Sequence, residues 1–199
     1  MSIDRSRRGA LQWLVIAGLA IVGPIACTPS VDVPGTAAAI TLTSSSVTDG
    51  VLPAKYTCDG AGISPALAWG APPSGTHSYA LITTDLDTPM RLLHRHPGVH
   101  WIIYALPATA RELPEGVAPQ PQLADGTLQG KNVISSIGYA GPCPPGSAAH
   151  RYAFTLYALD ARPDLPAGAG ERELVKALQG HVIGKGQLVA SFHRQGPTR

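Results

Sequence analysis

Residues 151–159 read RYAFTLYAL, a nine-residue run that is apolar on both faces when written as a strand. Such a run is typical of a strand in the middle of a sheet, where both faces are covered. Residues 78–85 (SYALITTD) and 99–106 (VHWIIYAL) are likewise rich in β-branched and aromatic residues and bounded by turn residues. These three runs predict a strand-based domain.

Weaker signals surround the three strands. Residues 40–43 and 66–69 read as short strands, the second closed by the turn GAPPSG at 70–75. Residues 171–179 predict a helix with Leu174, Val175 and Leu178 on one face and Gly180 as its stop signal. Residues 187–192 fit either a helical turn or a strand. We therefore expect a mostly β fold in which a large antiparallel sheet carries a few peripheral helices.

Composition limits the class of protein. The 199 residues include 22 Gly and 19 Pro, more than a helical bundle tolerates, while 44% hydrophobic and 14% charged residues argue against general disorder. Past Cys27, 12 basic residues face 12 acidic ones, so the net charge is zero. A nucleic-acid-binding protein needs a basic face to displace counterions, so we do not expect a nucleic-acid partner.

The first 26 residues resemble an export signal. Arg5, Arg7 and Arg8 precede an apolar run from residue 10 to 26 that is interrupted by Gln12 and weakened by glycines and Pro24. The run ends in PIAC at 24–27, which resembles a bacterial lipobox with proline where leucine is usual. Lipidation of Cys27 by acyl chains such as palmitate would hold the protein on a membrane of the cell envelope, facing the periplasm.

Two alternatives stay open for this segment. It can remain as an uncleaved anchor or be cleaved elsewhere, which would release a soluble periplasmic or secreted protein. The paired Arg7 and Arg8 resemble a twin-arginine signal, although a positively charged leader often contains adjacent arginines. Residues 27–39, small and proline-rich, predict a flexible tether. The domain itself is expected to span residues 40–196.

Cys58 and Cys143 remain once Cys27 is assigned to lipid attachment. An oxidising periplasm permits a disulfide between them, which would stabilise the fold by roughly 4 kcal/mol in the chain-entropy account. Two buried or free thiols are the alternative, because spacing alone does not show whether the side chains meet.

Polar residues gather where the expected strands begin or end. Asp85 and Asp87 close one strand, His100 opens the next, and His150 and Tyr152 open a third after the rigid loop GPCPPG at 141–146. Taken singly, such an aspartate is more often a turn former, a histidine is more often structural, and the loop is a stiff turn. Together they predict one pocket at one rim of the sheet.

Several of these motifs occur together in a known family. The sequence resembles the phosphatidylethanolamine-binding proteins, also called Raf kinase inhibitor protein-like, and in particular their bacterial branch. The resemblance extends from about residue 40 to 192 and is carried by CDG at 58–60, SPAL at 64–67, Trp69, DLDTP at 85–89, HW at 100–101, GPCPPG at 141–146, HRY at 150–152 and LYALD at 156–160. Leu86 departs from the proline that is usual there.

The resemblance implies a large antiparallel sheet, a smaller sheet and a few helices. It also implies a small anion pocket for phosphate-like or phospholipid head groups. The residues carried over as ligand-binding are Asp85, Pro89, His100, Gly141, Pro142, His150 and Tyr152. Asp87 is expected to brace the structure by contacting Arg151 or a loop N–H. Anion affinity should weaken as the pH rises through about 6.5 to 7.5, because a protonated histidine then loses its charge.

These features favour a binding protein over an enzyme, with no cofactor and no identified protein partner. The alternative is an envelope metalloenzyme or hydrolase that uses the cluster His94, His96 and His100 together with Asp85. A solvated loop is the simpler explanation of His94 and His96. A nucleophilic Cys143 or an acid–base pair of Asp85 and Asp87 is possible on chemical grounds, but no G-x-S-x-G elbow is present.

Overall fold

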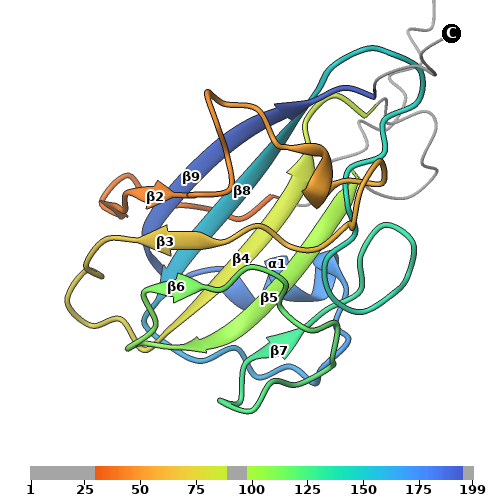
Figure 1. Ribbon diagram of the computed structural model, residues 1–199. Coiled ribbons are helices and arrows are strands. Elements are labelled where there is room, and N and C mark those ends of the chain that lie inside the picture. The colour runs from red at the N-terminus through yellow and green to blue at the C-terminus, as the bar shows by residue number, and fades with distance from the viewer. Residues whose placement is uncertain (1–29, 89–97, 195–199) are drawn as a thin grey trace, which may run out of the picture.

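The computed structural model describes residues 30–88 and 98–194. Its main element is a six-stranded sheet in the order β1-β9-β8-β4-β5-β7, faced by a three-stranded sheet in the order β2-β3-β6 (Figure 1). The large sheet comprises β1 (Ala38–Ala39), β4 (Ser78–Asp85), β5 (Val99–Pro107), β7 (Leu128–Gln129), β8 (His150–Leu159) and β9 (Val182–Phe192). The small sheet comprises β2 (Leu42–Thr43), β3 (Leu67–Trp69) and β6 (Glu112–Leu113).

The sequence prediction of a mostly β fold with a large and a smaller sheet is confirmed. The run 151–159 lies in β8, which pairs along its length with β4 on one side and β9 on the other. The large sheet is mixed rather than wholly antiparallel, because the short β1 pairs with β9 in parallel. In the described residues the helices are α1 (Glu171–Leu178) and the 3₁₀ turn η1 (Ala54–Tyr56), fewer than expected.

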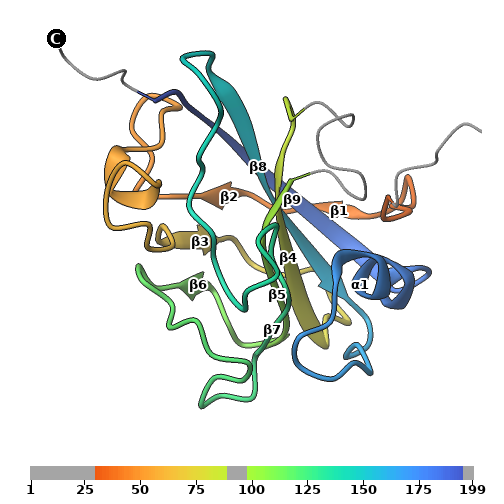
Figure 2. The same ribbon diagram turned by 90° about the vertical axis from the view of Figure 1, so that its right-hand side faces the viewer.

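Each face of the large sheet covers its own apolar cluster. Tyr79, Trp101 and Phe154 pack between the two sheets, whereas Ile82, Ile102 and their neighbours pack against Leu174 of α1. Figure 2 shows the small sheet on one side of the large sheet and α1 on the other. Because successive residues of β4, β5 and β8 point to opposite faces, strands that are covered on both sides must be apolar throughout.

The domain begins earlier than the sequence prediction of residue 40. Val31 and Val33 pack on the apolar cluster beneath α1, and the Asp32 N–H donates to Gln179 Oε1 at 3.0 Å. Ala38 then pairs with β9. Residues 30–39, which were expected to form part of a tether, therefore contact the domain at these points. Residues 1–29, which include Cys27, lie outside the described residues. Among the described residues, no helix is long and apolar enough to cross a membrane.

Candidate functional site

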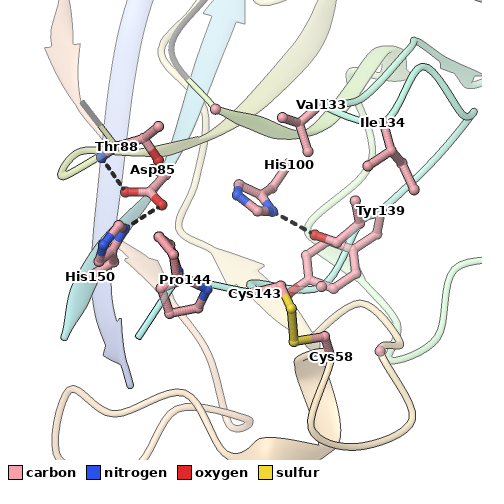
Figure 3. A pocket seen from close by; sticks show the side chains of 15 residues that line it. Cys58, Asp85, Thr88, His100, Val133, Ile134, Tyr139, Cys143, Pro144 and His150 are labelled. Carbon is pink, nitrogen blue, oxygen red and sulfur yellow. Dashed lines mark hydrogen bonds and ion pairs between the residues drawn. A yellow bond between two sulfur atoms is a disulfide. The ribbon is translucent and has the colours of Figure 1, made fainter. Parts of the chain in front are cut away.

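A cavity of about 590 Å³ opens where β4 ends and where β5 and β8 begin (Figure 3). The antiparallel pairing of β4 with both neighbours brings these three strand ends to one rim, with Asp85 directly opposite Tyr152. The described residues that line the cavity are Cys58, Gly62, Asp85, Thr88, Gly98, His100, Val133, Ile134, Tyr139, Ala140, Gly141, Cys143, Pro144, Pro145 and His150.

Asp85 and His150 form a buried pair in the cavity wall. His150 Nδ1 lies 2.8 Å from Asp85 Oδ2, and the two side chains are only 9% and 4% exposed. Burial by itself would raise the pKa of Asp85, but hydrogen bonds from His150, Thr88 and the backbone of Asp87 outweigh it and lower the pKa. The carboxylate is therefore ionised and accepts the Nδ1–H of His150.

His100 faces the same cavity from β5. Its Nδ1 lies 2.8 Å from the carbonyl oxygen of Ala140, and burial lowers the pKa of its imidazole. The Tyr152 ring meets the His100 ring edge-on, with centroids 5.1 Å apart, and is stacked near the His150 ring at 6.5 Å. Both imidazoles are thus fixed in orientation by an acceptor at Nδ1 and by the same tyrosine.

Asp87 points away from Asp85, although an extended strand would place both side chains on one face. Asp85 Oδ1 accepts the backbone N–H groups of Asp87 at 2.8 Å and Thr88 at 3.0 Å, so the chain turns directly after β4. Asp87 instead receives hydrogen bonds from the backbone and guanidinium of Arg151 at 2.7 to 2.9 Å. This pair braces the turn that positions Asp85.

A disulfide between Cys58 and Cys143 forms the opposite wall, with Cα atoms 5.4 Å apart. The Cys58 N–H also donates to the Pro142 carbonyl at 3.0 Å. Gly141 sits so close to Thr57 that an added Cβ would lie 3.0 to 3.1 Å from its backbone. Glycine at 141 therefore allows the loop 141–146 to approach the segment after η1 and complete the cavity.

The outer part of the cavity is apolar. Val133 and the 70% exposed Ile134 stand at its rim, and Tyr139, Pro144 and Pro145 line it further. Asn132 holds this tip in shape, since its Oδ1 accepts the N–H groups of Ile134 and Ser136 at 3.1 Å. The exposure of Ile134 is therefore fixed by a well-bonded turn.

Of the seven predicted ligand-binding residues, Asp85, His100, Gly141 and His150 line the cavity, where their binding role stays a prediction. Pro142 and Tyr152 lie behind that lining, the first paired with Cys58 and the second beneath both imidazoles. Pro89, like His94 and His96 of the proposed metal cluster, lies outside the described residues. Within the described part, no group of three or more His, Cys, Asp or Glu side chains could hold a metal ion.

The sequence prediction missed Thr88, Gly98, Val133, Ile134 and Tyr139 as lining residues. Thr88 directly precedes Pro89, and Gly98 lies two residues before His100, so closeness in sequence to predicted residues could have identified both. The sequence signal for Val133 and Ile134 was only that two apolar residues stand together inside a polar loop. That pattern does not reveal which pocket a loop approaches.

Comparison with known proteins shows the family to which this chain belongs. The phosphatidylethanolamine-binding protein family matches residues 43–193. A UPF0098 protein of Methanothermobacter thermautotrophicus is 42% identical over 145 residues, which cover 73% of this chain and 92% of that protein. A UPF0098 protein of Aquifex aeolicus is 36% identical over 145 residues, covering 72% of this chain and 81% of that one. The chain belongs to the phosphatidylethanolamine-binding protein family.

Solved structures show the same fold. The putative phosphatidylethanolamine-binding protein homologue CT736 of Chlamydia trachomatis superposes with a TM-score of 0.70 at 35% identity, covering 79% of this chain and 99% of that chain. YbcL of Escherichia coli, described as a member of the mammalian family, superposes with a TM-score of 0.69 at 26% identity, covering 78% of this chain and 99% of its own.

Proposed function

We propose that this protein is a cell-envelope binding protein whose cavity holds a phosphate-like anion or a phospholipid head group without transforming it. The observation that carries the proposal is the convergence of Asp85, His100 and His150 from three strand ends on one cavity. Family membership supports a ligand-binding role.

The cavity combines a small polar end with a larger apolar one. Buried imidazoles and the backbone of Gly141 suit an oxyanion, whereas Val133, Ile134 and the prolines suit an apolar substituent attached to it. The proposed ligand is therefore a small anionic group, alone or at the head of an amphiphile.

The envelope location rests on the sequence before Ser30. Arginines, an apolar run and PIAC at 24–27 are the signals of an exported lipoprotein. Labelling the full-length protein with palmitate in a bacterial host tests this, with Cys27→Ala as the matched control. Label that survives Cys27→Ala, or is absent from the parent protein, would contradict lipid attachment at Cys27.

Calorimetric titration of the full-length chain in a non-ionic detergent with phosphoethanolamine at pH 6 tests the binding function. One site is expected, and His100→Ala should weaken it by about tenfold or more, as expected for losing a hydrogen bond to a charged group. His181→Ala is the control, since His181 also pairs through Nδ1 with a carboxylate, that of Asp160, but lies outside the cavity. Equal binding in both variants would contradict the assignment.

The metalloenzyme alternative has its own test. Elemental analysis of the purified chain would show stoichiometric zinc or copper if His94, His96 and His100 form a metal site. His94→Ala should then remove that metal. A bound metal with this behaviour would replace the binding-protein proposal.

A further inference from the structure

The two histidines of the cavity are held in one tautomer. The Ala140 carbonyl can only accept a hydrogen bond, so the Nδ1 of a neutral His100 must carry the proton. The ionised carboxylate of Asp85 can likewise only accept, so His150 Nδ1 also carries a proton. In both neutral rings Nε2 is then a lone pair, and neither Nε2 has a hydrogen-bond partner among the described residues.

Permanent positive charge is missing from the described cavity wall. Asp85 is its one carboxylate, and none of its described residues is lysine or arginine. Arg151, which follows His150 in β8, donates its guanidinium N–H groups to the Asp87 carboxylate. Arg91, His94, Arg95 and His96 lie outside the described residues.

The two tyrosine hydroxyls near the imidazoles do not change this balance. The Tyr139 hydroxyl donates to the Tyr56 carbonyl, and the Tyr152 hydroxyl is buried near the Asp85 carboxylate. The Gly141 N–H, which has no partner among the described residues, remains as a donor that does not titrate. It can hold one oxygen of any oxyanion, and a second oxygen then meets the lone pairs at Nε2.

An oxyanion without a proton offers only acceptors to these lone pairs. We propose that the cavity binds a phosphoryl group together with a proton shared between a ligand oxygen and Nε2 of His100 or His150. The site then prefers inorganic phosphate and phosphate monoesters, which can bring that proton, to sulfate and phosphodiesters, which cannot. This inference rests on the proposed function and names its ligand class.

The proton balance gives a measurable consequence. A phosphate monoester has a second pKa of about 6, so above that pH the dianion dominates in solution and binding takes up a proton. Uptake of one proton makes the affinity fall by about tenfold for each pH unit of increase. A phosphodiester binds only when an imidazole itself is protonated, and burial lowers the pKa of His100.

Asp85 sets this selectivity through the tautomer of His150. Its Oδ1 already accepts two backbone N–H groups, so in Asp85→Asn the amide oxygen must occupy that position. The amide NH₂ then faces His150 Nδ1, which has to become the acceptor, and the proton moves to Nε2. The variant loses a negative charge and gains a donor, so it should bind sulfate and phosphodiesters better.

The test uses calorimetry on the full-length chain in detergent at pH 7.5, in buffers that differ in ionisation enthalpy. The probes are inorganic phosphate, phosphoethanolamine, sulfate and glycerophosphoethanolamine, a diester. We expect uptake of about one proton with phosphoethanolamine, and binding of sulfate and the diester that is about tenfold weaker or more. In Asp85→Asn that gap should close, while His181→Gln keeps it.

Nitrogen-15 shifts of the His150 ring report the tautomer without any ligand. They should show the proton on Nδ1 in the parent chain and on Nε2 in Asp85→Asn. Sulfate that binds as tightly as phosphate with no proton uptake would overturn the inference and leave the proposed function intact. Failure of all four anions to bind would instead overturn the proposed function. If Asp85→Asn does not fold, the anion selectivity of the parent chain and the number of protons that it takes up on binding still test the inference.

Discussion

The ring of Tyr152 stands perpendicular to the ring of His100, with centroids 5.1 Å apart. On its other side Tyr152 lies near His150 at 23° to that ring. The tyrosine is completely buried, so its contribution to the site is to fix the two imidazoles rather than to contact a ligand. This relation explains how histidines from separate strands are held in one arrangement.

Tyr152→Phe tests this positioning role. The Tyr152 hydroxyl is buried beside the Asp85 carboxylate and interacts with it, so removing it should change the unfolding free energy by no more than about 1 kcal/mol. Phosphoethanolamine affinity should stay within about twofold of the parent, because the ring contacts remain. Urea unfolding and calorimetry measure the two effects. A loss of more than about tenfold would identify the hydroxyl as a ligand contact.

The Cys58–Cys143 bridge should stabilise both the fold and the cavity. It closes a loop across a sequence separation of 85 residues, for which constraint of the unfolded chain contributes about 4 kcal/mol. The double variant Cys58→Ser/Cys143→Ser should lose a comparable free energy of unfolding, measured in urea under oxidising conditions. If the double variant unfolds at the same urea concentration as the parent, the bridge does not stabilise the native fold.

The Asp87–Arg151 pair predicts a pH-dependent contribution to stability. Hydrogen bonds from Arg151 lower the pKa of Asp87 to about 2. Because the folded-state pKa lies below the unfolded value, the contribution is present above about pH 4 and is lost as the pH falls toward 2. Arg151 is largely exposed, so Asp87→Asn should cost only about 0.5 to 1 kcal/mol at pH 7.

Thermal unfolding of Asp87→Asn beside the parent chain, from pH 7 down to pH 2, measures this difference. The two curves should converge at the acid end. A difference that persists unchanged at pH 2 would show that the variant acts through the shape of the turn rather than through the charge of Asp87.

Ile134 offers a way to separate the two ends of the cavity. Its 70% exposure means that Ile134→Ser should change stability by less than about 0.5 kcal/mol. Binding of phosphoethanolamine should be unaffected, while binding of a short-chain alkyl phosphate monoester should weaken by about threefold to tenfold. Equal affinities of parent and variant for the alkyl phosphate would mean that the apolar rim does not contact it.

The long elements of the fold followed from local pattern. Residues 78–85 could be placed because they are rich in β-branched and aromatic residues. Residues 171–178 could be placed because apolar residues recur on one face with the period of a helix. The two-residue strands β1, β6 and β7 could not be placed, since partners distant in sequence define them. The start of β9 was missed because Gly184 and Gly186 weaken the strand signal, although they give β1 and Ile40 room to approach.

The polar half of the site was also visible in the sequence, because strand ends in an antiparallel sheet meet at a common rim. The contact of Asp87 with Arg151 was expected, but two things were not visible: that Tyr152 lies beneath the lining, and that Ile134 reaches the rim. Each depends on a turn or a loop approach that one strand's pattern does not contain.

The most direct test of the binding site is an amide NMR titration of the full-length chain with phosphoethanolamine at pH 6. We expect saturable shifts that are concentrated at Gly98, His100, Ala140, Gly141 and His150, with little change at His181. Saturable shifts centred elsewhere, or no shifts at these five residues, would contradict the assignment of the cavity as an anion-binding site.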